Sequence, residues 1–180
     1  MSSPQSAVKV LVTGEPGSGK TTAVCQFVDA LRADGVGVDG FLTHEQRRDG
    51  HRVGFVVRDL RGDQAVLAHQ DSDSPVRVGR FGVDVDAFAR VAMPALRRAI
   101  ESADIIVIDE IARMELACPG FSELVSAAMA SPRPVVATVQ ARSTPFTDDL
   151  KREPQVTVVT VDASGRARVP ERLRRLLGFG

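Results

Sequence analysis

A segment near the amino terminus has the residue types and spacing of a phosphate-binding loop. It reads G-E-P-G-S-G-K-T at residues 14–21, which fits the pattern G-x-x-x-x-G-K-[ST]. In that pattern backbone N–H groups surround phosphate oxygens, the Lys20 amine reaches the β- and γ-phosphates, and the Thr21 hydroxyl binds Mg²⁺. The positive end of the following helix adds a favourable partial charge. The residues predicted to bind a nucleotide are Gly14, Glu15, Pro16, Gly17, Ser18, Gly19, Lys20, Thr21 and Thr22.

Two adjacent acids, Asp109 and Glu110, follow the apolar run I-I-V-I at residues 105–108. A continuous apolar run is typical of a strand that is buried on both faces. At the end of such a strand, beside the phosphate loop, Asp109 is predicted to bind Mg²⁺ together with Thr21. Glu110 is predicted to orient and deprotonate an attacking water. The alternative is a strand that simply ends in two solvated acids.

Arg113 and Gln140 are further candidates near this site. Arg113 is predicted to stabilise charge on the γ-phosphate, in the manner of an arginine finger supplied in cis. The alternative for Arg113 is a surface ion pair, for example with Glu115. Gln140 ends the apolar run that follows the acidic strand in the sequence, and this position alone suggests that it senses the γ-phosphate.

Polar residues also gather around a predicted hairpin. Thr43, Glu45 and Arg47 lie at the end of its first strand and are either substrate contacts or a polar hairpin edge. His44, His51 and His69 lack the spacing of metal ligands. A basic cluster has two interpretations, a solvated face interleaved with acids or a surface for a phosphate-bearing partner. Its members are Arg47, Arg48, Arg52, Arg58 and Arg61.

The elements that must position these residues follow from hydrophobic periodicity. Asp49-Gly50 is a strong turn signal and predicts an antiparallel hairpin. Pro94 is expected to kink a helix or to begin a second one. Residues 71–75 are expected to form a loop. Strands are predicted at 8–12, 36–43, 53–60, 64–69, 105–108, 135–140 and 156–161, and helices at 20–34, 84–102, 121–130 and 171–177. Strands separated by helical crossovers predict a doubly wound α/β fold with a mostly parallel sheet.

Composition bounds the class of protein. The 180 residues predict a single domain over 1–180, with 1–6 as a disordered lead-in. There is no apolar stretch long enough to span a membrane and no signal-peptide pattern, and Cys25 and Cys118 are expected to be reduced thiols, so a cytoplasmic protein is expected. The 23 acidic and 23 basic residues balance, which argues against binding driven by nucleic-acid charge. The chain has no Asn, so it cannot carry the guanine-reading motif N-K-x-D.

Several segments resemble one known family nearly from end to end. Residues 108–116, I-D-E-I-A-R-M-E-L, closely resemble the signature I-D-E-I-G-K-M-E-L of the small thermophile-type nucleoside-triphosphatases, which also have cancer-related members in animals. Residues 40–47, 50–55 and 78–83 are similar to further segments of that family. The resemblance implies a P-loop NTPase fold, a RecA-like three-layer sandwich with an extra strand between the two motif strands. It also implies slow, Mg²⁺-dependent hydrolysis of several nucleoside triphosphates.

The chain departs from the family pattern at three places. Ala112 and Arg113 replace Gly and Lys, so a cation is kept but its geometry changes. Arg80 and Phe81 replace Lys and Tyr, which removes a hydroxyl. Residues 161–166, V-D-A-S-G-R, stand where family members often carry Asn-Arg, so the contribution of that pair to holding the base is open.

The sequence therefore predicts a Mg²⁺-dependent hydrolase that accepts ATP, GTP, CTP and UTP with broad base tolerance and slow turnover. One alternative is a phosphotransferase of the nucleotide-kinase type, with a small acceptor near the hairpin. Another is a nucleotide-gated module that binds nucleic acid, which the zero net charge and the eight aromatic residues disfavour. A monomer is favoured.

Overall fold

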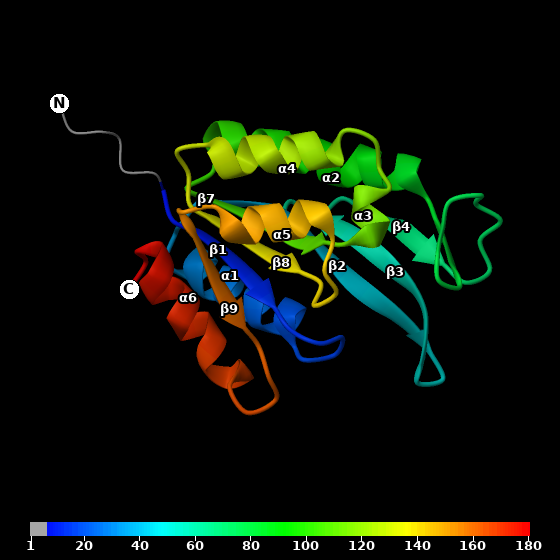
Figure 1. The fold of residues 1–180 in the computed structure, drawn as a ribbon, viewed down its shortest axis with the longest axis horizontal. Coiled ribbons are helices and arrows are strands. Elements are labelled where there is room, and N and C mark those ends of the chain that lie inside the picture. Colours follow the sequence, from blue (N-terminus) through cyan, green and yellow to red (C-terminus); the bar gives the residue numbers. More distant parts are fainter. Residues whose placement is uncertain (1–6) are drawn as a thin grey trace.

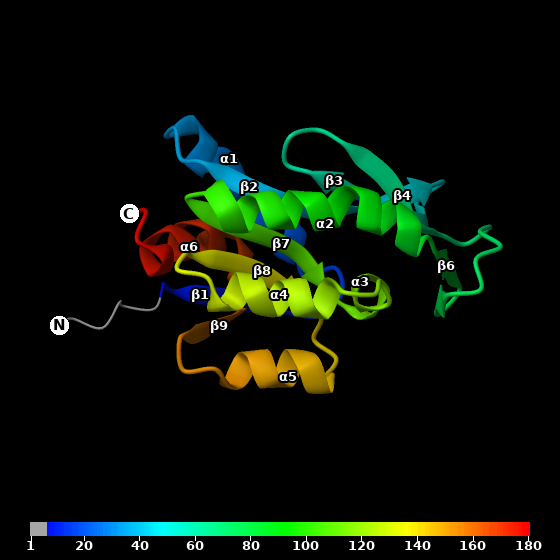
Figure 2. The same ribbon diagram turned by 90° about the horizontal axis from the view of Figure 1, so that it is seen from above.

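A computed structural model describes residues 7–180, which form a nine-stranded sheet with helices on both faces (Figures 1 and 2). The predicted lead-in, 1–6, lies outside the described residues. The strands are β1 (Lys9–Thr13), β2 (Val38–Arg48), β3 (His51–Asp59), β4 (Gln64–His69), β5 (Arg77–Val78), β6 (Phe81–Val83), β7 (Ile105–Ile111), β8 (Val135–Val139) and β9 (Val156–Thr160). The helices are α1 (Lys20–Ala33), α2 (Val85–Ser102), α3 (Arg113–Leu116), α4 (Phe121–Ala130), α5 (Pro145–Arg152) and α6 (Val169–Leu177), with a short 3₁₀ turn at Arg166–Arg168.

The strand order divides the sheet into a parallel and an antiparallel half. The order is β5-β6-β4-β3-β2-β7-β8-β1-β9. From β2 to β9 neighbouring strands are parallel, whereas β2, β3, β4, β6 and β5 pair antiparallel. The mixed α/β sheet and its hairpin are confirmed, and the antiparallel half extends further than predicted. Because β8 lies between β1 and β7, the carboxyl ends of all three meet at one edge.

Two apolar clusters, one on each face, fix this sheet. Successive side chains of a strand point to opposite faces, and β1 shows this directly. Val10 and Val12 join the cluster that contains Phe27 of α1, whereas Leu11 joins the cluster under α2 and α4. Helices α1 and α6 cover one face, and α2 and α4 cover the other (Figure 2). Both Val10 and Leu11 are fully buried, as a central parallel strand requires.

Pro94 does not begin a second helix, because α2 continues through it from Val85 to Ser102. Pro94 and Arg90, whose carbonyl loses its helical donor, are both on the exposed side of α2. Water can therefore satisfy that carbonyl. The neighbours Met93 and Ala95 are buried against the core and hold the helix in place.

The predicted hairpin is confirmed and its turn is tighter than expected. Strand β2 continues through Arg48, and β3 begins at His51, so only Asp49 and Gly50 form the turn. Both turn residues have positive φ, 50° and 76°, as a two-residue hairpin turn requires. The polar composition of residues 44–48 hid this strand from the hydrophobic pattern. The short elements β5, β6, α3 and α5 were likewise not predicted. Across residues 7–180, no helix has the length and apolar character needed to cross a membrane.

Candidate functional site

The phosphate loop connects β1 to α1 at the carboxyl edge of the parallel half. Gly17 and Gly19 have φ of 79° and 97°, a conformation that a residue with a side chain rarely adopts. The Lys20 side chain is buried and folds back across the loop, where its Nζ donates a hydrogen bond to the Gly14 carbonyl at 2.9 Å. The amine is thus held over the loop whose N–H groups would surround the β- and γ-phosphates.

Asp109 lies at the end of β7 and is fully buried. Its Oδ1 accepts hydrogen bonds from the hydroxyls of Thr21, at 3.1 Å, and Thr138, and its Oδ2 accepts from the backbone N–H of Thr43 at 3.3 Å. Burial raises the pKa of Asp109, while the bonds from Thr138, Thr43 and Thr21 act to lower it. Donors from α1, β2 and β8 thus fix one carboxylate.

The two predicted metal ligands, Thr21 and Asp109, are in direct contact. Their oxygens suit Mg²⁺, which is typically bound by one or two protein groups, phosphate oxygens and water. In the described part of the chain, no three His, Cys, Asp or Glu side chains are grouped so that they could hold a metal ion by themselves. The donor set therefore fits an ion that arrives with a nucleotide.

Glu110 faces the phosphate loop. Its Oε1 lies 3.7 Å from Lys20 Nζ, and its side chain is 27% exposed. Burial raises the pKa of Glu110; the charge of Lys20 opposes this shift and that of Asp109 adds to it. A carboxylate whose pKa is raised is a stronger base. The structure thus brings Lys20, Thr21, Asp109 and Glu110 together from α1 and β7.

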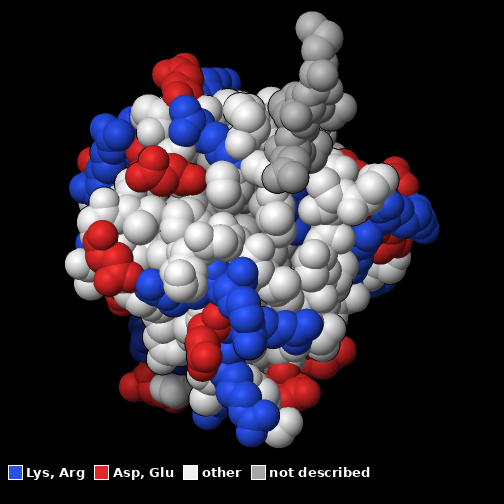
Figure 3. Space-filling model, turned by 90° about the vertical axis from the view of Figure 1, so that its left-hand side faces the viewer, with Lys and Arg blue, Asp and Glu red and all other residues white. Residues whose placement is uncertain are grey.

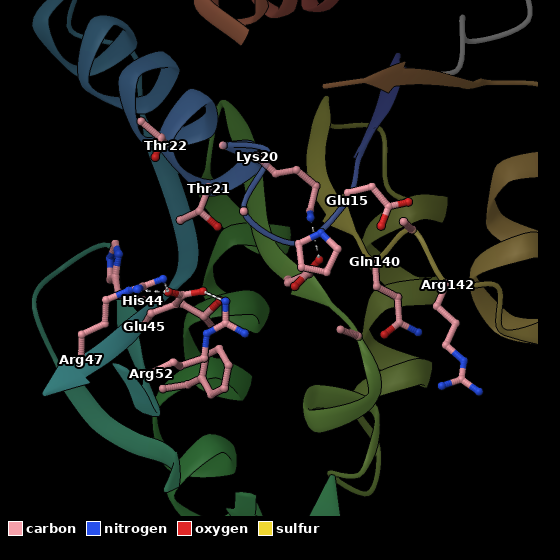
Figure 4. A pocket seen from close by; sticks show the side chains of 18 residues that line it. Glu15, Lys20, Thr21, Thr22, His44, Glu45, Arg47, Arg52, Gln140 and Arg142 are labelled. Carbon is pink, nitrogen blue, oxygen red and sulfur yellow. Dashed lines mark hydrogen bonds and ion pairs between the residues drawn. The ribbon is translucent and has the colours of Figure 1, made fainter. Parts of the chain in front are cut away.

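Lys20, Thr21 and Glu110 open onto a cavity of about 620 Å³, and the fully buried Asp109 lies behind Thr21 (Figure 4). One wall consists of phosphate-loop residues and the first turn of α1, from Glu15 to Thr22, without Ser18. Glu110 and Ala112 line the middle, and Gln140, Ala141 and Arg142 line the side next to β8. Gly14 and Ser18 line a second cavity, of about 630 Å³, together with residues 160–163 at the end of β9 and just after it. All of the predicted nucleotide-binding residues therefore line one of the two cavities.

The hairpin forms the opposite wall of the first cavity. Thr43, His44, Glu45 and Arg47 line it, with Arg52 and Phe55, which were not singled out as substrate contacts. The Glu45 carboxylate pairs with Arg47 at 2.7 Å and with Arg52, whose guanidinium lies 5.5 Å from the centre of the Phe55 ring. Although burial acts to raise it, bonds from Arg52 and Arg47 hold the pKa of Glu45 below its ordinary value.

The other hairpin candidates lie outside this cavity. His51 and His69 do not line it, and neither do Arg48, Arg58 and Arg61. Arg61 instead pairs with Asp39 at 3.1 Å, which places it in a structural ion pair.

Arg113 is the first residue of α3, is exposed and does not line the cavity. The geometry therefore does not support its predicted contact with the γ-phosphate. The alternative ion pair with Glu115 is also not formed, because the Glu115 side chain is buried and accepts a bond from the Ala112 N–H. Burial, with the nearby charge of Glu110, raises the pKa of Glu115 to about 8.

Arg142 is a cavity residue that the sequence analysis missed. It lies in the connection between β8 and α5, two residues after Gln140. The only signal in the sequence was that Arg142 lies two residues after Gln140, the candidate sensor of the γ-phosphate. Thr138 was missed as well, because a threonine inside an apolar strand gives no pattern of its own, although it contacts Asp109.

The fold and site define a nucleoside-triphosphatase of the small α/β type. Residues 9–174 match the family described as NTPase, and the chain belongs to it. It is 36% identical over 172 residues to the nucleoside-triphosphatase THEP1 of Thermotoga sp. (strain RQ2), with 96% of this chain and 97% of that protein covered. It is 40% identical to THEP1 of Thermofilum pendens, with 94% of each covered. The chain is therefore an enzyme, a nucleoside-triphosphatase.

Two solved structures agree with this fold. The crystal structure of THEP1 from the hyperthermophile Aquifex aeolicus has a TM-score of 0.86 and 34% identity, covering 94% of this chain and 99% of that one. The solution structure of a human cancer-related nucleoside triphosphatase has a TM-score of 0.80 and 31% identity, covering 96% and 98%.

Proposed function

We propose that this enzyme hydrolyses nucleoside triphosphates to diphosphates and phosphate in a Mg²⁺-dependent reaction on a RecA-like P-loop fold. The observation that carries the proposal is the convergence of Lys20 and Thr21, at the start of α1, with Asp109 and Glu110, at the end of β7, although β8 lies between β1 and β7. A strand inserted between the phosphate-loop strand and the acidic strand is typical of RecA-like folds. As expectations from the sequence, we also propose a monomer in the cytoplasm.

The residues divide the work of hydrolysis. Backbone N–H groups of the loop and Lys20 bind the β- and γ-phosphates. Glu110 accepts a proton from the water that attacks γ-phosphorus, while the bond to the bridging oxygen breaks and the diphosphate leaves. Mg²⁺, held by Thr21 and Asp109, would neutralise developing charge. Slow turnover is proposed from the family resemblance in the sequence.

The second cavity supports broad base tolerance. It lies on the other side of the phosphate loop, where Thr160 ends β9 and residues 161–163 follow. Asp162 lines it, but its Oδ1 accepts bonds from the N–H groups of Ser164, at 2.9 Å, and Gly165, at 2.7 Å, and from the Ser164 hydroxyl. Because Oδ1 already accepts these bonds, Asp162 cannot offer both carboxylate oxygens to guanine at once, and this supports broad base tolerance.

Phosphate release from ATP, GTP, CTP and UTP tests this proposal, each measured with Mg²⁺ and with EDTA. We expect the four kcat/KM values to agree within about tenfold, or ~1.4 kcal/mol in the transition state. EDTA should abolish release in every case. Activity with GTP alone, or activity that survives EDTA, would contradict the proposal.

One observation favours phosphotransfer as a second candidate. The first cavity continues past Glu110 to the hairpin wall, where Arg47 and Arg52 offer cationic groups beyond the position of the γ-phosphate. An acceptor hydroxyl there would take the place of water. To test this, small alcohols that carry a phosphate group are added as acceptors together with labelled ATP. A phosphotransferase would form labelled acceptor faster than it releases labelled phosphate.

Charge distribution does not favour a nucleic-acid module. On the face shown in Figure 3, basic side chains gather in the lower half, at the level of α6 in Figure 1, and acidic side chains lie among them. Binding driven by phosphate charge needs an excess of cations, and the chain has 23 residues of each sign.

A further inference from the structure

The cations that line the first cavity differ in whether they have a partner. Lys20 lies 3.7 Å from Glu110, and Arg47 and Arg52 both pair with Glu45. Arg142 is the exception, because no carboxylate of residues 7–180 lies within ion-pair distance of it. Its charge is therefore available to a ligand in the cavity.

Gln140 provides a second and independent observation. Its Nε2 is buried and has no hydrogen-bond partner within the described residues, although the residue lines the cavity. Buried donors are nearly always paired in native structures, so an unpaired one calls for an explanation. A turn of the Gln140 side-chain amide would expose this donor to the cavity, where a ligand oxygen would supply the missing acceptor.

Strand register places Gln140 close to the residues of the site. In the parallel pair of β7 and β8, Ile111 lies opposite Val139. Gln140, the next residue after Val139, therefore lies close to the residues that follow Glu110. Alternate residues of a strand share a face, and two residues before Gln140 the hydroxyl of Thr138 contacts Asp109. Gln140 therefore lies on the side of the sheet that carries the site.

Figure 4 shows Gln140 and Arg142 on the wall opposite the hairpin residues Glu45 and Arg52. The Arg142 side chain extends along this wall and away from the phosphate loop. It is exposed, so rotation about its side-chain bonds meets little packing. To contact the γ-phosphate, the Arg142 side chain has to turn back toward the phosphate loop about these bonds.

We propose that Gln140 and Arg142 are catalytic residues that bind the γ-phosphoryl group in the transition state. Gln140 donates its Nε2–H to a γ-phosphate oxygen, and Arg142 neutralises the charge that develops on the equatorial oxygens. Arg142 thereby takes the role that the sequence suggested for Arg113. This inference rests on the proposed hydrolase function.

The first test compares Arg142→Ala with Arg152→Ala, a matched variant of an exposed arginine that pairs with Asp149 and does not line the cavity. Removal of a transition-state donor lowers kcat by about 10²–10³-fold, which we expect for Arg142→Ala with KM and ADP affinity nearly unchanged. Affinity for ADP with aluminium fluoride, which mimics the transferring group, should fall in parallel. Added guanidinium should restore part of the lost rate, and Arg152→Ala should behave as the unmodified enzyme.

The second test uses Gln140→Leu, which keeps the approximate size and removes the donor. We expect kcat to fall by at least about tenfold, as for a lost donor to the transition state, without a decrease in Tm, because the donor has no partner to lose. A fall in Tm with unchanged kcat would mean a structural role and would overturn the proposal for Gln140.

Glu110→Gln, measured in the same assay, distinguishes a failure of this inference from a failure of the proposed hydrolase function. If it loses turnover while Arg142→Ala and Gln140→Leu keep kcat and aluminium fluoride affinity within about threefold, the present inference is wrong and the hydrolase site stands. If Glu110→Gln also keeps the normal rate, the proposed function fails, and the inference fails with it.

Discussion

The parallel half of the sheet and the antiparallel half contribute different kinds of wall to the same cavity. In the parallel half, Lys20 and Asp109 are buried and held by hydrogen bonds from several elements. In the antiparallel half, Glu45 and Arg47 are exposed and are held mainly by ion pairs on the hairpin. Preorganised buried groups stabilise charge without rearranging, whereas surface pairs contribute little. We therefore assign the chemistry to the parallel half.

The largest effect is expected from Lys20→Ala. Lys20 is the one side-chain cation of the loop itself, so its loss should weaken triphosphate affinity by more than about tenfold, or ~1.4 kcal/mol, and abolish turnover. Equilibrium binding of a labelled nucleotide measures the first effect and phosphate release the second. A smaller loss of affinity would contradict the assignment of the phosphate loop.

Asp109→Asn should produce the next largest effect. The substitution keeps the shape but removes one negative ligand, so turnover should fall and be partly regained at high Mg²⁺. Titration of phosphate release against Mg²⁺ measures this shift. A defect that no Mg²⁺ concentration relieves would mean that Asp109 acts only through its contacts with Thr21 and Thr138.

Glu115 offers a prediction about stability and pH in the parallel half. Its folded pKa of about 8 lies above the ordinary value of 4.5, so between these values the folded state binds more protons than the unfolded state. Its contribution therefore makes the free energy of unfolding decrease as pH rises from about 5 to about 8. Denaturant unfolding at several pH values should show that the free energy of unfolding depends less on pH in Glu115→Gln than in the unmodified protein. An identical slope in both proteins would contradict the raised pKa.

The smallest effect is expected in the antiparallel half, from Glu45→Gln. The exposed pairs of Glu45 with Arg47 and Arg52 should stabilise the fold by about 1 kcal/mol or less. Because the chemistry is assigned to the parallel half, phosphate release should change by less than about fivefold, a difference of ~1 kcal/mol in the barrier. Thermal unfolding measures the effect on stability, and steady-state kinetics measures the effect on phosphate release. A large loss of hydrolysis would show that the hairpin takes part in the chemistry, and would break the division between the halves.

Residues in local motifs were predictable, and residues positioned by strand order were not. The pattern around Lys20 and the acids after the buried strand are each contained in one short segment, so sequence alone indicated their roles. Arg142 became visible only when β8 was found between β1 and β7, an order set by long-range packing. Arg113 follows the acids closely in sequence, but α3 begins there and leaves its side chain exposed.

The central claim, that Glu110 is the base of a hydrolytic site, is tested most directly by Glu110→Gln. The variant keeps the shape of the side chain and removes the base. Its kcat for phosphate release should fall by about 10²–10⁴-fold, the usual contribution of general base catalysis. Binding of a labelled nucleotide with Mg²⁺, measured beside it, should be nearly unchanged, because the loop and Lys20 hold the phosphates. A variant that releases phosphate at close to the normal rate would contradict the account.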